Sequence, residues 1–224
     1  MSGTELLRAI VGDVGDFLEH MVFTGGLVLP LYLTRPPRLR IRPTRDADVV
    51  VACESHAAWV RLQMELGALG VIPIVGDPSA PICRMRTATG HLLDLMPANP
   101  AVLGFGNPWF QAGYDRAITV EIGAARPIRI FPAALYVAAK IEAYRGRGKA
   151  DPWMSHDLED LLTLMACRAS LVDETRAEPD AVKEFLRNAA REILALARLD
   201  ELIHAHIQEP HAQVVSVLST IAAN

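Results

Sequence analysis

The stretch "RPTRDADVVVA", residues 42–52, decides the fold, because it places two carboxylates at the head of an apolar, β-branched run. In an extended chain Asp46 and Asp48 project from one face, whereas Ala47 and Val49 face the other way. Two neighbouring carboxylates repel each other and lose hydration unless a cation joins them. The pattern therefore predicts a β-strand that begins at a cation site. Mg²⁺, or Mn²⁺, is the expected cation, because these ions prefer oxygen ligands.

A third acid, Asp94, interrupts the apolar run "HLLDLMP" at residues 91–97 and predicts a neighbouring strand that completes this metal site. Three convergent carboxylates hold metal ions that activate an attacking oxygen and stabilise a leaving oxygen in nucleotidyl transfer. About twenty residues before the first acid, Gly25 and Gly26 form a turn whose backbone amides can cradle phosphates at a helix start. The metal ligands expected are Asp46, Asp48 and Asp94.

The bulk composition is that of a globular protein with one large domain or two small lobes. Its 224 residues are 51% hydrophobic and 21% charged, with a net charge of −4, which argues against a disordered chain and against a generic polyanion binder. The three cysteines form no Cys-x-x-Cys pair, so neither a disulfide framework nor a zinc site is expected. No signal peptide or membrane-spanning run is evident, and the expected location is the cytoplasm.

Hydrophobic periodicity predicts an α+β protein, with a mixed β-sheet flanked by helices and a C-terminal helical lobe. Residues 1–131 are expected to form the α/β domain and residues 132–224 the helical domain. Helices are predicted at residues 4–20, 55–66, 132–148, 155–170 and 179–207 and at the C-terminus, a strand at 46–52, a further strand at 70–76, and hairpins at 81–97 and 116–132.

Two groups of residues resemble a known family. The sequence "FTGGLVLPLYL…RPTRDADVVV" resembles the nucleotidyltransferase-fold signature, in which a Gly-Gly or Gly-Ser turn precedes a strand bearing Asp-x-Asp. The later "IFPAALYVAAKIEAYRGRG…SHDLEDLLTL" is similar to the helical motif of AbiEii/AbiGii-type toxin nucleotidyltransferases. The resemblance spans residues 21–165 and implies a nucleotidyltransferase-like sheet.

The resemblance also implies roles for residues of the helical lobe. Lys140 matches the lysine that the family directs at nucleotide phosphates. Asp157 matches an acid that supports catalysis, and Asp160 matches one that supports helix packing. Five arginines at residues 35–45 are interpreted as a positive rim that steers phosphates toward the acids, and Arg45, next to Asp46, is assigned to nucleotide binding.

The predicted function is Mg²⁺-dependent transfer of a nucleoside monophosphate from an NTP, such as ATP, to an acceptor hydroxyl. The resemblance suggests the toxin of a bacterial toxin–antitoxin pair, with a cognate antitoxin as partner. The acceptor is expected to be an RNA end, such as that of a tRNA, or a protein side chain. An alternative is a non-catalytic module that retains the fold and binds a nucleotide or a partner protein. A third alternative is a small-molecule acceptor, such as an aminoglycoside.

Each feature also has a purely structural interpretation. The two acids of "DAD" could begin a strand and pair with nearby arginines, and the arginine-rich segment could be a solvated loop. Lys140 could extend its ammonium group to the surface. Asp157 and Asp160 could cap a helix that begins near Ser155, where negative charge is favourable.

Overall fold

The computed structural model describes residues 2–77 and 80–224, which form two compact units. The first unit comprises Met1–Val28 and Arg42–Pro132, and the second comprises Leu29–Ile41 and Ala133–Asn224. The chain is an α+β protein with a seven-stranded mixed sheet flanked by helices and a C-terminal helical region. The sequence-based division placed residues 29–41 with the sheet, whereas their contacts group them with the helices.

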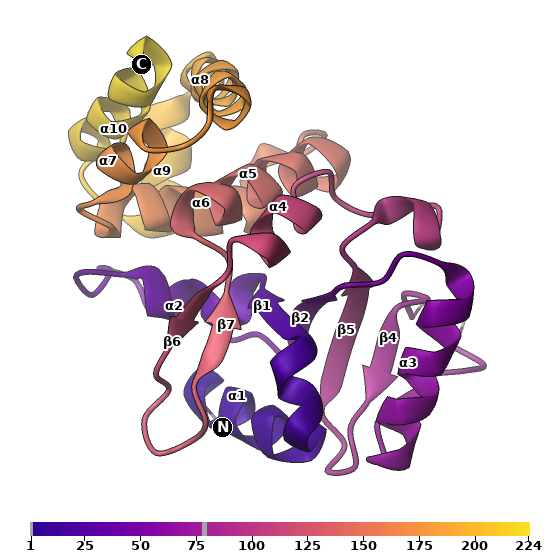
Figure 1. Cartoon of the computed structure of the whole chain (residues 1–224). Helices are drawn as coiled ribbons and strands as arrows, with labels where there is room; N and C mark the ends of the chain where they lie inside the picture. Colours follow the sequence, from indigo (N-terminus) through magenta and orange to yellow (C-terminus); the bar gives the residue numbers. More distant parts are fainter. Residues whose placement is uncertain (1, 78–79) are drawn as a thin grey trace. The chain divides into compact units, whose positions relative to one another are not determined.

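The first unit contains the sheet, whose strands run in the order β3-β4-β5-β2-β1-β7-β6. Figure 1 labels all of these strands except β3. Its strands are β1 Met21–Thr24, β2 Asp46–Val51, β3 Ile72–Pro73, β4 Arg84–Arg86, β5 Leu92–Pro97, β6 Ile118–Val120 and β7 Ile128–Ile130. Its helices are α1 Gly3–Val14, α3 His56–Ala68 and α4 Phe110–Asp115, with the short 3-10 segments Gly15–His20, Gly26–Val28 and Pro100–Val102.

Strand pairing explains why the sheet is mixed. The central strand β2 is antiparallel to β1 and parallel to β5, and β1 is parallel to β7. The predicted hairpins are present as the antiparallel pairs β4–β5 and β6–β7. The parallel pairing of β2 with β5 places the polar residues of these two strands next to each other inside the sheet.

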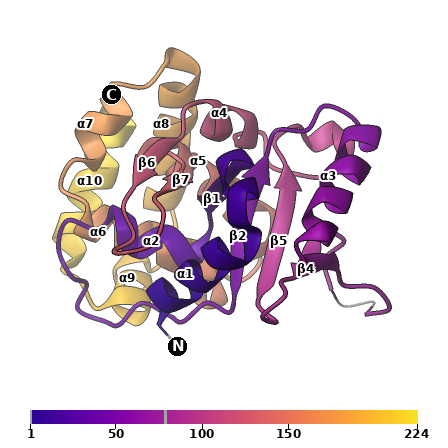
Figure 2. The same cartoon turned by 60° about the horizontal axis from the view of Figure 1, so that its bottom comes forward.

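Helix α1 links two hairpins that are far apart in the sequence. Arg8 donates a hydrogen bond to the carbonyl of Ile122, in the β6–β7 turn, at 2.9 Å. Thr89, in the β4–β5 turn, donates to the Asp13 carboxylate at 2.5 Å. Figure 2 shows α1 near β1 and β2, with α3 beside β4.

The first helix is shorter than predicted. The N-cap is Ser2, two residues before the predicted start at residue 4, and it forms a capping box with Glu5. The helix ends at Val14, because Gly15 adopts a left-handed φ of +52°, and a 3-10 segment continues to His20. The single helix expected over residues 4–20 is therefore wrong in its second half.

The second unit consists of helices: α2 Leu29–Tyr32, α5 Ala133–Ala143, α6 His156–Cys167, α7 Leu171–Arg176, α8 Asp180–Leu194, α9 Leu199–Ile207 and α10 His211–Ala223. A π-helical turn, Tyr144–Gly148, and a 3-10 turn, Pro152–Met154, lie between α5 and α6. Helix α10 packs against α8 and α6, and α5 packs against α6, α7 and α8. No helix in the described part of the chain is long and apolar enough to cross a membrane.

The long helix predicted at residues 179–207 is wrong, because the chain breaks between α8 and α9. Arg198 adopts left-handed backbone angles, with φ at 57° and ψ at 38°. Its guanidinium binds Glu201 at 2.8 Å and lies 5.2 Å from the centroid of the Trp153 ring. These contacts lie at the break, where the left-handed backbone of Arg198 interrupts the helix that local propensity would continue.

Two glycine-to-alanine substitutions test the packing of the sheet-containing unit. A Cβ at Gly113 of α4 would lie 2.5 Å from the Phe131 ring, so Gly113→Ala is expected to destabilise the protein by about 1–3 kcal/mol. Gly12, in the last turn of α1, has open space around it, so Gly12→Ala is expected to stabilise by up to about 0.5 kcal/mol. Denaturant unfolding measures both values, and equal effects of the two substitutions would contradict this packing.

Candidate functional site

The two acid-bearing strands lie side by side, and their register aligns the acids. Asp48 of β2 is directly opposite Asp94 of the parallel strand β5. Ala47 and Val49 are fully buried on the other face of β2, as their alternation with the acids predicts. Asp46 lies two residues before Asp48, and therefore three carboxylates occupy one face of the sheet.

The glycine turn meets this acidic face. Gly25 follows β1, which pairs with β2 so that Thr24 is opposite Asp48. Gly25 has a left-handed φ of +72°, and a Cβ there would overlap Asp48 Oδ2 and lie 2.6 Å from Asp48 Cγ. Only glycine permits this approach of backbone to carboxylate. Gly26 begins a buried 3-10 segment, and not the longer helix that a strong phosphate cradle would need.

Arg84 binds two of the three acids, and the sequence analysis did not identify it. Its Nε and Nη2 donate to Asp94 Oδ1 and Oδ2, both at 2.7 Å, and Nη2 also donates to Asp46 Oδ2 at 2.6 Å. The hydrogen bonds to Asp94 raise the pKa of Arg84 further above its already high ordinary value. The guanidinium is therefore a permanent positive charge between the two carboxylates.

The hairpin register contains the signal that could have identified Arg84. Thr87 and His91 close the β4–β5 turn, and the antiparallel pairing that follows places Arg84 opposite Asp94. Directly opposed residues have their side chains on the same face, so a cross-strand ion pair follows from the position of the turn. The hairpin predicted over residues 81–97 contains this pair, but its register was not extended to Arg84.

The negative charge of this face affects the thiol of Cys83. Burial, together with the charges of Asp94 and Asp48, raises the pKa of Cys83 to about 11. The negative charge of this face therefore disfavours the thiolate form of Cys83.

The carboxylates have the chemistry of Mg²⁺ ligands, but their arrangement is not that of a metal centre. Asp46 and Asp94 direct oxygens at Arg84. Across residues 2–77 and 80–224, no group of three or more His, Cys, Asp or Glu side chains is placed to hold a metal ion. The acids in this arrangement bind an internal cation.

Lys140 lies in a second cluster, inside the helical unit. Residues 133–141 of α5 are all buried, and Lys140 is the one charged residue among them. Its Nζ lies 3.1 Å from Asp157 Oδ1 and 2.5 Å from Asp160 Oδ2, both on α6. The ammonium therefore does not extend to the surface, and it binds two acids that the resemblance had grouped with it.

Arg147 adds a second cation to this cluster, and the sequence analysis missed it as well. It lies in the π-helical turn after α5 and binds both oxygens of Asp157, at 2.8 and 3.0 Å. Burial by itself would raise the pKa of Asp157, but the positive charges of Lys140 and Arg147 outweigh it, and the pKa is lowered. The N-cap of α6 is Ser155, and not Asp157. Asp157 is instead held by its ion pairs with Lys140 and Arg147.

Two of the five clustered arginines are anchored within the helical unit. Arg35 Nη2 binds the buried Glu209 at 2.8 Å, and the backbone N–H of Arg38 donates to the same carboxylate at 2.8 Å. The hydrogen bond from Arg35 lowers the pKa of Glu209. Arg45 is exposed at the head of β2, beside Asp46. Arg35 and Arg38 are thus structural, and nucleotide binding by Arg45 stays a prediction.

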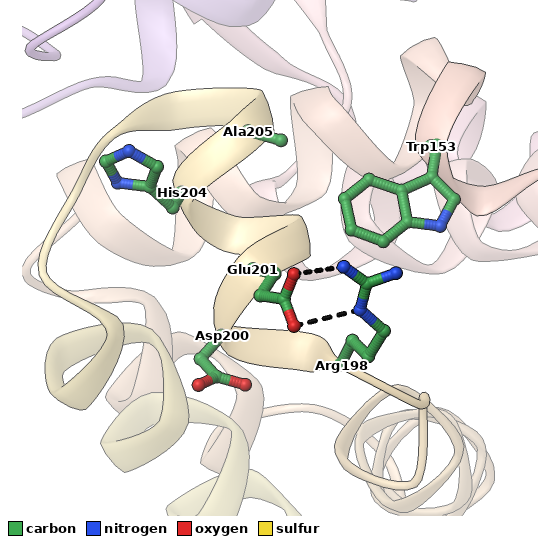
Figure 3. Close-up of a pocket in the computed structure, with 6 residues that line it drawn as sticks. All are labelled: Trp153, Arg198, Asp200, Glu201, His204 and Ala205. Atoms are coloured by element: carbon green, nitrogen blue, oxygen red, sulfur yellow. Dashed lines mark hydrogen bonds and ion pairs between the residues drawn. The ribbon is translucent and has the colours of Figure 1, made fainter.

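A shallow depression of about 400 Å³ lies on the helical unit, lined by Trp153, Arg198, Asp200, Glu201, His204 and Ala205 (Figure 3). The Arg198–Glu201 ion pair crosses it, and the Trp153 ring forms one wall. Arg198 stacks on Trp153 and binds Glu201. The depression is therefore lined by the residues that contact one another at the break between α8 and α9.

Comparisons with known proteins add no assignment. No protein-family model matches the sequence, and no curated protein matches it significantly.

The close approach of Gly25 to Asp48 predicts a severe effect of Gly25→Ala. The left-handed φ alone costs about 1–2 kcal/mol, and the overlap with Asp48 adds to it. Gly90→Ala is the matched control, because Gly90 has a φ of +91° and open space around it. In denaturant unfolding, Gly25→Ala is expected to lose clearly more stability than Gly90→Ala, and the opposite order would contradict the contact.

The ion pairs of Asp157 predict an acid-sensitive stability. Because its pKa is lower in the folded state than the ordinary value of about 3.9, its stabilisation is complete above that value and is lost as the pH falls through the lowered pKa. Asp157→Asn is expected to lower stability at neutral pH by about 2 kcal/mol and to make the loss at acid pH shallower.

Asp173→Asn is the control for this experiment. Asp173 is exposed in the same unit and pairs with Arg176 at 3.2 Å, so its removal should change stability by no more than about 0.5 kcal/mol. The measurement is urea unfolding at a series of pH values from 7 down to about 2, so that the series extends well below the ordinary pKa of about 3.9. A curve for Asp157→Asn parallel to that of the unsubstituted protein would disprove the role of Asp157.

Proposed function

We propose that the chain is a nucleotidyltransferase with a nucleotidyltransferase-like sheet. The observation that supports this best is the contact between Gly25 and Asp48, together with the register of Asp48 opposite Asp94. A glycine turn and three acids thereby meet on one face of a sheet, as the resemblance to the family implies. The order and spacing of the motifs in the sequence provide independent support.

In the proposed reaction, an acceptor hydroxyl attacks the α-phosphorus of an NTP, and the bond to the leaving pyrophosphate breaks. Asp46, Asp48 and Asp94 would form the catalytic face, and the backbone at Gly25 and Gly26 would lie next to the phosphates. The resemblance implies Mg²⁺ or Mn²⁺ as the cofactor. The carboxylates are suitable ligands, whereas the arrangement in which Arg84 binds two of them does not provide a metal geometry.

The helical cluster has a supporting place in this proposal. The resemblance gives Lys140 a phosphate-binding role and Asp157 a catalytic role. Lys140 is held by two carboxylates and Asp157 by two cations, so these charges are mutually fixed inside the helical unit. These ion pairs satisfy the charges within the helical unit, so the roles of Lys140 and Asp157 in the reaction are proposed from the resemblance alone.

The acceptor, the partner and the biological setting are proposed from the resemblance alone. They are an RNA end, such as that of a tRNA, or a protein hydroxyl as acceptor, a cognate antitoxin as partner, and the role of a toxin in the cytoplasm. Fold-level likeness is analogy, and the chemistry of the acidic face carries none of these points.

The second candidate is a non-catalytic module that binds a nucleotide or a partner protein. The bridging position of Arg84 favours it, because an arginine between Asp46 and Asp94 satisfies these acids without a metal. The two candidates differ in whether phosphorus chemistry occurs, and one assay separates them.

The assay incubates the full chain with each α-labelled NTP, Mg²⁺ or Mn²⁺, total RNA and cell protein. The unsubstituted chain is expected to label an acceptor, and Asp46→Ala and Asp48→Ala are expected to reduce the rate at least about a hundredfold, which corresponds to about 2.7 kcal/mol. Asp16→Ala is the matched control, because Asp16 is a fully exposed acid of the same unit.

Label transfer that depends on Asp46 and Asp48 but not on Asp16 would support the enzyme. If no acceptor is labelled by any NTP, or if Asp46→Ala labels at the unsubstituted rate, transfer by this face is rejected. Binding of an NTP without transfer would instead favour the second candidate.

A further inference from the structure

The outer face of helix α3 is apolar. Of its thirteen residues, His56–Ala68, only Trp59 and Leu66 are buried. Eight others are exposed, and five of these eight are apolar: Ala57, Val60, Met64, Gly67 and Ala68. The solvent face of an ordinary surface helix is polar, because its apolar stripe faces the core. Helix α3 therefore has an apolar face that the described part of the chain leaves exposed.

Other exposed apolar side chains lie in the same part of the chain. Ten large apolar residues are exposed in the part that the structure describes, and six of them lie between residues 60 and 82: Val60, Met64, Leu69, Ile72, Val75 and Ile82. Helix α3 lies beside β4 in both views (Figures 1 and 2), and β3, which follows α3, is the outermost strand at this end of the sheet. Apolar side chains gathered in one region mark an interaction surface, whereas singly scattered ones do not.

The exposed apolar residues of α3 have the spacing of paired helices. Ala57, Val60, Met64 and Gly67 follow one another at intervals of three, four and three residues, as the a and d positions of a heptad do. We call these four residues the α3 seam. Met64, near its centre, is 71% exposed. The seam thus has the pattern by which one α-helix packs along another.

The charges beside the α3 seam make this surface complementary to itself. Arg61 and Glu65 are both exposed and lie on the same flank of the seam, one helical turn apart. In an antiparallel pair the same flanks of the two helices lie side by side, so Arg61 of each copy lies beside the flank that carries Glu65 of the other. A two-fold interface requires such self-complementarity, and two like charges on this flank would repel each other.

We propose that the α3 seam binds the same seam of a second copy of the chain, in an antiparallel two-fold pair. Val60 and Met64 of the two copies pack at the centre, and Arg61 and Glu65 form ion pairs along the edge. A helix of thirteen residues is about 20 Å long, so the helix pair buries less than the roughly 800 Å² per partner of a stable interface. The dimer is therefore reversible. The inference goes beyond the proposed function and does not rest on it.

Sedimentation velocity of the full chain at rising concentration tests the proposal, because the sedimentation coefficient of a reversible dimer increases with concentration. Met64→Glu places a charge at the centre of the seam and is expected to raise the dimer dissociation constant at least about tenfold. Met154→Glu is the matched control, because Met154 is 73% exposed and lies in the helical unit. This control should leave the dissociation constant within about twofold of the unsubstituted value.

Reversal of the flanking charges tests the antiparallel arrangement. Arg61→Glu places like charges beside each other in the pair and is expected to raise the dissociation constant about three- to tenfold. Arg61→Glu combined with Glu65→Arg exchanges the two charges and should restore the dissociation constant to within about twofold of the unsubstituted value. In a parallel pair this flank would instead lie beside the one that carries the uncharged Gln63, and the reversal would have little effect.

A chain that stays monomeric at every concentration would overturn the proposal and leave the face to a different partner. A dimer that Met64→Glu weakens no more than Met154→Glu would also overturn it, because another surface then holds the copies together. Met64 is exposed, so Met64→Glu should keep the denaturant midpoint of the unsubstituted protein. If it does not, the charge reversal decides, and a double variant as weak as Arg61→Glu alone rejects the antiparallel pair.

Discussion

The constraint on which the sheet-containing unit depends is the compensation of three carboxylates on one face. The parallel pairing of β2 and β5 places Asp48 beside Asp94, and the antiparallel pairing of β4 and β5 places Arg84 beside Asp94. Uncompensated acids at these positions would repel each other and lose hydration. The guanidinium of Arg84 therefore reduces the electrostatic cost of placing Asp46 and Asp94 close together. The buried valines of β2 belong to the hydrophobic core.

In the helical unit the buried charge is a cation, and acids compensate it. Helix α5 is buried on all sides over nine residues, so the ammonium of Lys140 needs acids close by. Asp157 and Asp160, one helical turn apart on α6, supply them, and Arg147 balances the excess negative charge. Gly148 allows the π-helical turn to lie against Ser155, because a Cβ there would overlap the serine hydroxyl. Each unit thus has one ionic cluster that fixes side chains in place.

Local patterns predicted much of the fold and part of the site. Period-two alternation identified β2 and its acidic face, and the turn residues identified both hairpins. The same reasoning failed at residues 179–207, where the left-handed backbone of Arg198 separates α8 from α9 in a segment that helix propensity would continue. It also missed Arg84, although the hairpin register places Arg84 opposite Asp94, and it missed Arg147, whose partner Asp157 lies on another helix and gives no local signal.

The sequence by itself determined the α+β class, the common face of Asp46 and Asp48, and the need of Lys140 and Asp94 for partners, because these follow from side-chain periodicity and from the cost of burying charge. The tertiary structure alone decided which partners they have. Strand register brought Arg84 to Asp46 and Asp94, and helix packing brought Lys140 to Asp157 and Asp160. Two charges form an ion pair only when they are close in space, and residues far apart in the chain come close only in the folded protein.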